Sequence, residues 1–162
     1  MGHWEEGGKS NEWYTPKYIF DALGCHFDTD VSAPELGPMH TPCDTWIYRN
    51  SLDEDWRGFV WMNPPFGGRN GLIPWLDKFC NHGNGIALVP DRTSAPWWQD
   101  MADWAEQIMF IDGKVRFIRP DCSLGKSPSV GTTLIAMGKR GCDALENAER
   151  EGLGRRFVRR YA

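Results

Sequence analysis

The sequence predicts an α/β fold in which helices cover both faces of a mixed, mostly parallel sheet. Short apolar runs typical of strands alternate along the chain with segments of helical periodicity. Residues 85–89 form a continuous apolar run, as expected for a central parallel strand covered on both faces. Polar turns near Asp30, Asn63 and Asp91 each follow a strand. Because ligands bind beyond the carboxyl ends of strands in such sheets, we expect these turns to converge on one site.

The first helix is expected to begin at Thr15-Pro16, with Thr15 as its N-cap and Pro16 at the first helical position. Gly24 is expected to end it. Ser94 is the expected cap of a later helix over residues 95–105. The other elements are read in the same way: strands at residues 26–31, 45–48, 59–62, 85–89, 107–111, 114–118 and 130–137, and helices at residues 72–80 and 142–151.

A chain of 162 residues can bury one full core and is too short for two ordinary domains. We expect a flexible tail at residues 1–11, a single domain at residues 12–152 and a basic tail at residues 153–162. No apolar stretch approaches the length of a membrane span, and no signal peptide is evident. The expected location is therefore the cytoplasm, with no membrane partner.

The five cysteines are odd in number and scattered, which favours reduced thiols over disulfides. Cys25-His26 and the pair His40 and Cys43 lack the usual spacing of zinc ligands, so no metal is expected. Charge is unevenly distributed along the chain. Residues 1–110 carry seven Lys/Arg against sixteen Asp/Glu, whereas residues 111–162 carry eleven against six. A basic lobe on an acidic protein suits a polyanion partner, although a solvated basic tail is the simpler interpretation of residues 155–162.

The motif Asn63-Pro64-Pro65-Phe66 follows an apolar strand and suits chemistry on a planar amine. The Asn63 side-chain oxygen and the Pro64 carbonyl can accept both hydrogens of an exocyclic NH2, and Phe66 can stack on its ring. Two acceptors off the ring plane favour a pyramidal nitrogen and aim its lone pair at an electrophile. The alternative is a turn of two prolines that ends a strand, with Phe66 in the core.

Four blocks in order resemble the phage-type Dam family of small DNA N6-adenine methyltransferases, which use S-adenosylmethionine (SAM). The blocks are Glu12-Trp13-Tyr14-Thr15-Pro16; residues 27–33; residues 50–52 with Trp56 and residues 61–66; and residues 85–90 with Trp97-Trp98 and residues 113–117. The resemblance spans roughly residues 12–137 and implies a Rossmann-like SAM-dependent methyltransferase fold. It also implies DNA as the partner, with no obligate protein partner.

The resemblance implies roles for the matched residues. Asn63, Pro64, Pro65 and Phe66 would hold and stack the target adenine, with Phe117 as a second aromatic side chain or a core residue. The implied cofactor contacts are Thr15, Pro16, Asp30, Ser32, Ala33 and Asn50. Thr15 is equally a helix cap, and Asp30 is alternatively a turn residue. The sequence departs from the family at the cofactor turn, which lacks glycines, at Asn50, where aspartate is usual, and at Phe66, where tyrosine is usual.

The chain has no room for a separate target-recognition domain, although reaching a base inside a duplex requires extruding it. The candidates for DNA contact are Arg69, Lys114, Arg116, Arg119 and Lys126, together with the arginine-rich C-terminus. We therefore expect short or relaxed specificity that rests mainly on phosphate contacts. Two alternatives remain open: a methyltransferase acting on cytosine N4, RNA adenine or a protein glutamine, and a non-catalytic nucleic-acid-binding protein.

Overall fold

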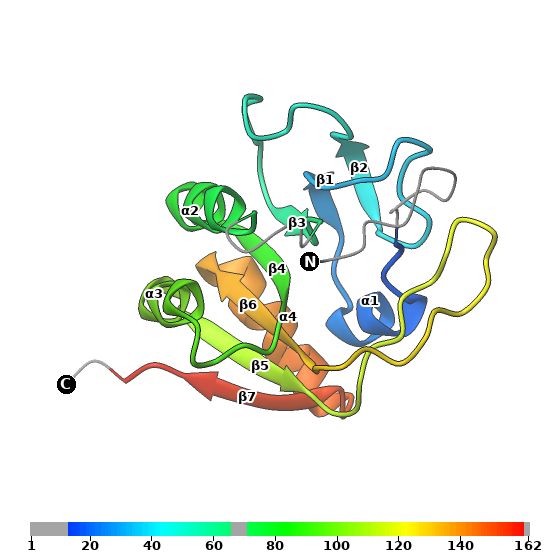
Figure 1. Ribbon diagram of the computed structural model, residues 1–162. Coiled ribbons are helices and arrows are strands. Elements are labelled where there is room, and N and C mark those ends of the chain that lie inside the picture. The colour runs from blue at the N-terminus through cyan, green and yellow to red at the C-terminus, as the bar shows by residue number, and fades with distance from the viewer. Residues whose placement is uncertain (1–12, 66–70, 161–162) are drawn as a thin grey trace, which may run out of the picture.

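The computed structural model describes residues 13–65 and 71–160. In this part of the chain a seven-stranded sheet has the order β2-β1-β3-β4-β6-β5-β7 (Figure 1). The strands are β1 (Phe27–Asp30), β2 (Cys43–Trp46), β3 (Val60–Met62), β4 (Gly85–Pro90), β5 (Gln107–Ile111), β6 (Thr132–Met137) and β7 (Gly154–Val158). The helices are α1 (Lys17–Leu23), α2 (Ile73–His82), α3 (Pro96–Trp104) and α4 (Gly138–Arg150).

The strand directions divide the sheet into two halves. The neighbours β2, β1, β3 and β4 pair in parallel. The strand β6 runs antiparallel to both β4 and β5, and β7 runs antiparallel to β5. Three of the six pairings are therefore parallel and three antiparallel, and the expectation of a mostly parallel sheet is not confirmed. Apolar patterns locate strands but carry no information on their direction, and this left the insertion of β6 between β4 and β5 unpredicted.

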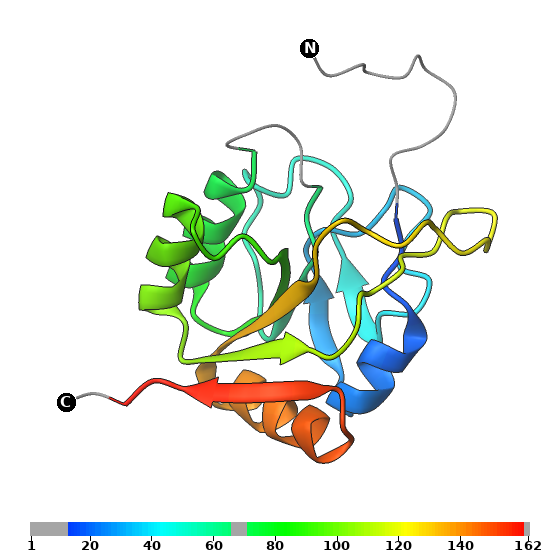
Figure 2. The same ribbon diagram turned by 60° about the horizontal axis from the view of Figure 1, so that its bottom comes forward.

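Helices cover both faces of the sheet, as the sequence predicted. Alternation along β4 shows the arrangement: Ile86 and Leu88 belong to one buried cluster, and Ala87 and Val89 belong to the other. The first cluster packs against α1 and α4, and the second packs against α2 and α3. Figures 1 and 2 show these helix pairs on separate sides of the sheet. The core thus forms two layers, one on each face of the sheet.

The helix starts differ from the expected caps. Pro16 is the N-cap residue of α1, and neither it nor Ala95 at the start of α3 provides a side-chain cap. The predictions that Thr15 and Ser94 cap these helices are therefore wrong. The Thr15 hydroxyl instead accepts a hydrogen bond from the Asn63 side chain, 48 residues further along the chain. Gly24 does end α1, in the left-handed conformation with φ of 62°, as predicted.

Two basic segments also differ from expectation. Residues 114–118 form no strand; Ile118 makes only isolated bridges to Tyr14 and Leu124. The preceding strand, β5, already has β6 and β7 on its two sides, so the chain leaves the sheet here. Part of the expected C-terminal tail is instead β7, which is paired along its length with β5. Its long basic side chains are compatible with an exposed sheet edge.

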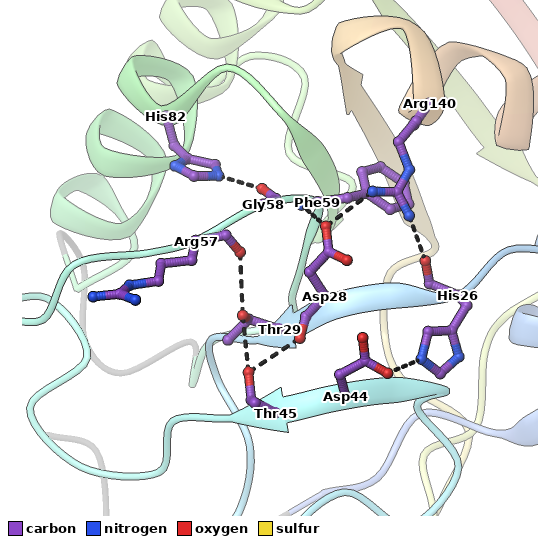
Figure 3. Close-up of polar contacts among 10 residues, drawn as sticks. All are labelled: His26, Asp28, Thr29, Asp44, Thr45, Arg57, Gly58, Phe59, His82 and Arg140. Atoms are coloured by element: carbon purple, nitrogen blue, oxygen red, sulfur yellow. Dashed lines mark hydrogen bonds and ion pairs between the residues drawn. The ribbon is translucent and has the colours of Figure 1, made fainter.

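A polar cluster ties the amino edge of the sheet together (Figure 3). The Asp28 carboxylate accepts hydrogen bonds from the Phe59 backbone N–H at 2.7 Å and from Arg140 Nη1 at 2.9 Å. Arg140 also donates to the His26 carbonyl, and its guanidinium lies 4.5 Å from the centre of the Phe59 ring. The Phe59 N–H, followed by the neighbouring guanidinium, lowers the pKa of Asp28. This cluster joins β1, the entrance to β3 and α4, at the opposite edge from the polar turns.

Candidate functional site

A cavity of about 990 Å³ opens at the carboxyl edge of the parallel strands. Three of its walls are the segments that follow β1, β2 and β3, at residues 31–35, 47–51 and 63–65. The other wall contains Trp13, Phe117, Arg119 and residues 126–128. From β1 the chain goes to β2 on one side and then returns to β3 on the other, so the cavity lies at a topological switch point. Its volume is at the upper end of the range for small-molecule sites in proteins.

Asn63 is held from two directions at the end of β3. Its backbone N–H donates to Ser32 Oγ at 2.7 Å, and its side-chain Nδ2 donates to Thr15 Oγ1 at 3.0 Å. With the amide nitrogen engaged in this way, Oδ1 is the atom of the side chain that remains to accept a hydrogen bond from a ligand. Asn63, Pro64 and Pro65 all line the cavity, whereas Phe66 lies outside the described residues. The structure therefore places three of the four residues of the predicted amine-binding motif in the cavity wall.

Asp30 lies beneath the cavity wall and is only 3% exposed. Its Oδ1 accepts hydrogen bonds from the Ser32 backbone N–H at 3.0 Å and from Ser32 Oγ at 3.4 Å. Burial raises the pKa of Asp30 to about 6, against the effect of hydrogen bonds from Ser32 and Thr41. These contacts favour the interpretation of Asp30 as a turn residue, which positions Ser32 and through it the backbone of Asn63.

The other expected cofactor residues are divided between the wall and its support. Ser32, Ala33 and Asn50 line the cavity directly. Asn50 adopts a left-handed backbone with φ of 53°, a conformation that asparagine tolerates better than most residues. Thr15 supports the wall through Asn63, and Pro16 is the N-cap residue of α1. The structure thus brings together residues from three separate parts of the chain.

The expected DNA contacts are also divided. Phe117, Arg119 and Lys126 line the cavity, whereas Lys114 and Arg116 do not. Arg116 Nε donates to the Gly125 carbonyl at 2.9 Å, and Arg119 Nη1 donates to the Leu124 carbonyl at 3.0 Å. Both arginines therefore brace the loop between β5 and β6. Arg69 lies outside the described residues.

Several residues of the wall received no role from the sequence. Glu35 forms an ion pair with Arg49, and both line the cavity near Tyr48. Arg49 and Tyr48 immediately precede Asn50, at the end of a strand, so the rule that polar strand ends line the site would have found them. Trp13 belongs to the first block of the family resemblance, which implied no role for it. Trp75 comes from α2, and no sequence signal connects it to the cavity.

Within residues 13–65 and 71–160, no three His, Cys, Asp or Glu side chains gather to hold a metal ion. The His26 side chain, which follows Cys25 in the sequence, contacts Asp44 instead, with 2.6 Å between Nε2 and Oδ1. Burial raises the pKa of both Cys25 and Cys43 to about 11, so these thiols stay protonated near neutral pH. No helix in the described part of the chain is long and apolar enough to cross a membrane.

The strand order and the cavity at the switch point define an α/β protein whose cavity wall contains Asn63 and Pro64. A family model for DNA N-6-adenine-methyltransferase (Dam) matches residues 6–140. This match covers most of the chain, which therefore belongs to the Dam family, and membership indicates a DNA adenine-N6 methyltransferase. The comparisons with curated proteins and with solved structures gave no match.

Proposed function

We propose that the cavity holds SAM beside the target adenine and that Asn63 and Pro64 act directly on the adenine amine. The cofactor would occupy the side formed by residues 31–35 and 47–51, where β1 and β2 end. Residues there fit such a ligand: Ser32 and Ala33 are small, Tyr48 offers an aromatic face, and Glu35 and Asn50 offer polar groups. The target adenine would lie between the Asn63 turn and the wall that contains Phe117.

The proposed chemistry is direct transfer to N6 without a covalent enzyme intermediate. SAM, when bound, would supply an electrophilic methyl group to N6, and its sulfur would keep the electron pair of the carbon–sulfur bond that breaks. Asn63 Oδ1 and the Pro64 carbonyl each accept a hydrogen of the amine, which holds N6 pyramidal and leaves its lone pair free to react. The proton that N6 loses passes to solvent.

We also propose that the fold is a Rossmann-like methyltransferase fold. Four parallel strands with a switch point between β1 and β3 support this proposal, and so does the pairing of helices on both faces. The antiparallel β6 and β7 extend the sheet on the side away from the β1 and β2 wall. The five free cysteines suit the reducing environment of the cytoplasm, which is the proposed location.

The observation that carries the proposal is the double anchoring of Asn63 in the cavity wall. Replacing Asn63 with alanine should abolish methyl transfer to DNA, while calorimetric titration with SAM gives a dissociation constant close to that of the wild type. Asn81→Ala is the matched control, because Asn81 is exposed on α2 and does not line the cavity. Wild-type activity in Asn63→Ala would overturn the assignment of Asn63. Failure of the wild type to bind SAM would overturn the proposed cofactor site.

A further inference from the structure

Trp13 shares the wall of the cavity with the residues proposed to hold the target adenine. The backbone at Tyr14 is extended and pairs with Ile118 through two hydrogen bonds, of 2.8 and 2.9 Å. Side chains alternate along an extended backbone, so Trp13 and Thr15 lie on the same side, about 7 Å apart along the chain. Because Thr15 contacts Asn63, this side is the side of the cavity. Trp13 therefore lies beside Thr15 on the cavity side, close to the Asn63 turn.

The loop between β5 and β6 supports the Trp13 ring. The Arg119 guanidinium lies over the ring, 5.3 Å from its centre. The backbone of Gly125 lies so close that a Cβ atom there would be 2.7 Å from Trp13 Cζ3. The loop itself is closed by hydrogen bonds from the Arg119 N–H to the Ser123 carbonyl and from the Gly125 N–H to the Phe117 carbonyl. The ring is thus held in place by a folded segment.

Despite these contacts, Trp13 remains 44% exposed, in contrast to its buried neighbours Tyr14 and Thr15, which are each 6% exposed. A large aromatic side chain that is positioned by its surroundings and still open to a cavity is suited to stacking a flat ligand. The cations Arg119 and Lys126 line the same wall and suit a phosphate backbone that continues from the target nucleotide. The wall therefore has the features of a stacking platform for single-stranded nucleic acid.

We propose that Trp13 stacks the base next to the target adenine in an unpaired DNA strand. This inference rests on the proposed function, because it locates the neighbouring nucleotide relative to the adenine held by Asn63. Extrusion of the adenine from a duplex exposes only the face of the neighbouring base that pointed toward the adenine, whereas an unpaired strand can turn the whole neighbouring base toward Trp13. The preferred substrate of this subsite is accordingly DNA in which the target adenine and one neighbour are both unpaired. Stacking on an indole accepts any base, so this subsite adds affinity without reading sequence.

The test is a cycle that combines an enzyme variant with a substrate variant. The substrate is a single-stranded oligonucleotide with one adenine in a thymine tract, either intact or with an abasic site at the 5′ or the 3′ neighbour of the adenine. For the wild type, one of the two abasic sites should lower kcat/KM by roughly 5- to 100-fold, which corresponds to the loss of one base stacked on an aromatic side chain. Trp13→Ala should show a similar loss on the intact substrate and no further loss on the abasic one.

Two variants serve as controls in the same assay. Trp13→Phe keeps an aromatic face and should retain most of the sensitivity to the abasic site. Trp104→Ala removes an exposed tryptophan of α3 that is not part of the cavity wall, and it should behave as the wild type does. A duplex with an unpaired bubble over the adenine and its neighbour should be a better substrate than the fully paired duplex.

The outcomes separate this inference from the proposed function. If the wild type and Trp13→Ala lose the same factor at each abasic site, or if neither abasic site affects the wild type, the stacking subsite is overturned while adenine methylation stands. If the wild type methylates no adenine in any of these DNAs, the proposed function itself is contradicted. A wild type that prefers the fully paired duplex to the bubble contradicts the unpaired substrate.

Discussion

Thr15 Oγ1 accepts a hydrogen bond from Asn63 Nδ2 at 3.0 Å, across 48 residues of sequence. This bond determines which end of the amide is available to a ligand, because it engages the nitrogen and leaves the oxygen. It also connects the segment before α1 to the end of β3. We therefore regard Thr15 as a positioning residue.

Thr15→Val tests this role, since valine has nearly the shape of threonine but cannot accept the bond. We expect kcat to fall by roughly 10- to 100-fold, because small misplacements of an acceptor have effects of this size. The KM for SAM should change little. Thr15→Ser should recover most of the activity. Steady-state kinetics of the wild type, Thr15→Val and Thr15→Ser measure these changes. A large rise in the KM for SAM at constant kcat would instead assign Thr15 to cofactor binding.

The stability of the fold should depend on pH through Asp30. The pKa of Asp30 is raised to about 6 by burial, so its contribution to stability is fully present below the unfolded pKa, near 4, and is lost as the pH rises through about 6. Asp30→Asn does not titrate. The unfolding free energy of this variant, relative to the wild type, should therefore increase by up to about 3 kcal/mol between pH 4 and pH 7.

Chemical denaturation of both proteins at each pH measures this difference and cancels the titration of other groups. A difference that stays constant from pH 4 to pH 7 would show that Asp30 does not titrate in this range.

A side chain at position 58 is excluded both by the backbone conformation of Gly58 and by the neighbouring Asp28 side chain. The φ of Gly58 is +67°, and a Cβ atom there would lie 2.2 Å from Asp28 Oδ2, inside the cluster that ties the amino edge of the sheet together (Figure 3). Gly152 has a similar φ, +81°, but no atom lies within 4 Å of its Cβ position. We expect Gly152→Ala to cost about 1–2 kcal/mol of stability from backbone strain alone, and Gly58→Ala to cost clearly more. Equal losses in thermal or denaturant unfolding would exclude an effect of the Asp28 contact.

Two lysines of the basic segment should contribute differently to DNA affinity. Lys126 lines the cavity wall and Lys114 does not, although both are exposed. Lys126→Ala should weaken binding and reduce the slope of log affinity against log salt by about 1, as expected for one lost phosphate contact. Lys114→Ala should leave the slope nearly unchanged. Fluorescence anisotropy with a labelled oligonucleotide over a series of salt concentrations measures both, and identical slopes for the two variants would remove the distinction.

Much of the fold follows from local patterns. The apolar runs predicted most of the strands, and Gly24 was correctly predicted to end α1, because each depends on residues close together in the chain. The strand directions were not predictable in this way. The edge strand β7 was not predictable either, because two of its five residues are arginines. Its partner, β5, lies some fifty residues earlier in the chain.

The site residues also differ in whether they could be predicted from residues close together in the chain. Asn63 and Pro64 could be proposed as site residues because they belong to one short motif at the end of a strand, and both line the cavity. The hydrogen bond from Asn63 to the Thr15 hydroxyl could not be predicted, because it forms only once the sheet has assembled. The expectation for Asp30 considered the carboxylate at a strand end but not its burial. In the structure the Asp30 side chain is buried, accepts a hydrogen bond from the Ser32 N–H and does not line the cavity.

The central claim is that this chain transfers a methyl group from SAM to N6 of adenine in DNA through the Asn63 turn. The most direct test incubates the purified protein with isotopically labelled SAM and unmethylated DNA, digests the DNA to nucleosides and identifies the labelled product by mass spectrometry. Our account predicts labelled N6-methyldeoxyadenosine with the wild type and none with Asn63→Ala. Label found only in N4-methyldeoxycytidine, or only in RNA or protein offered in parallel, would contradict it.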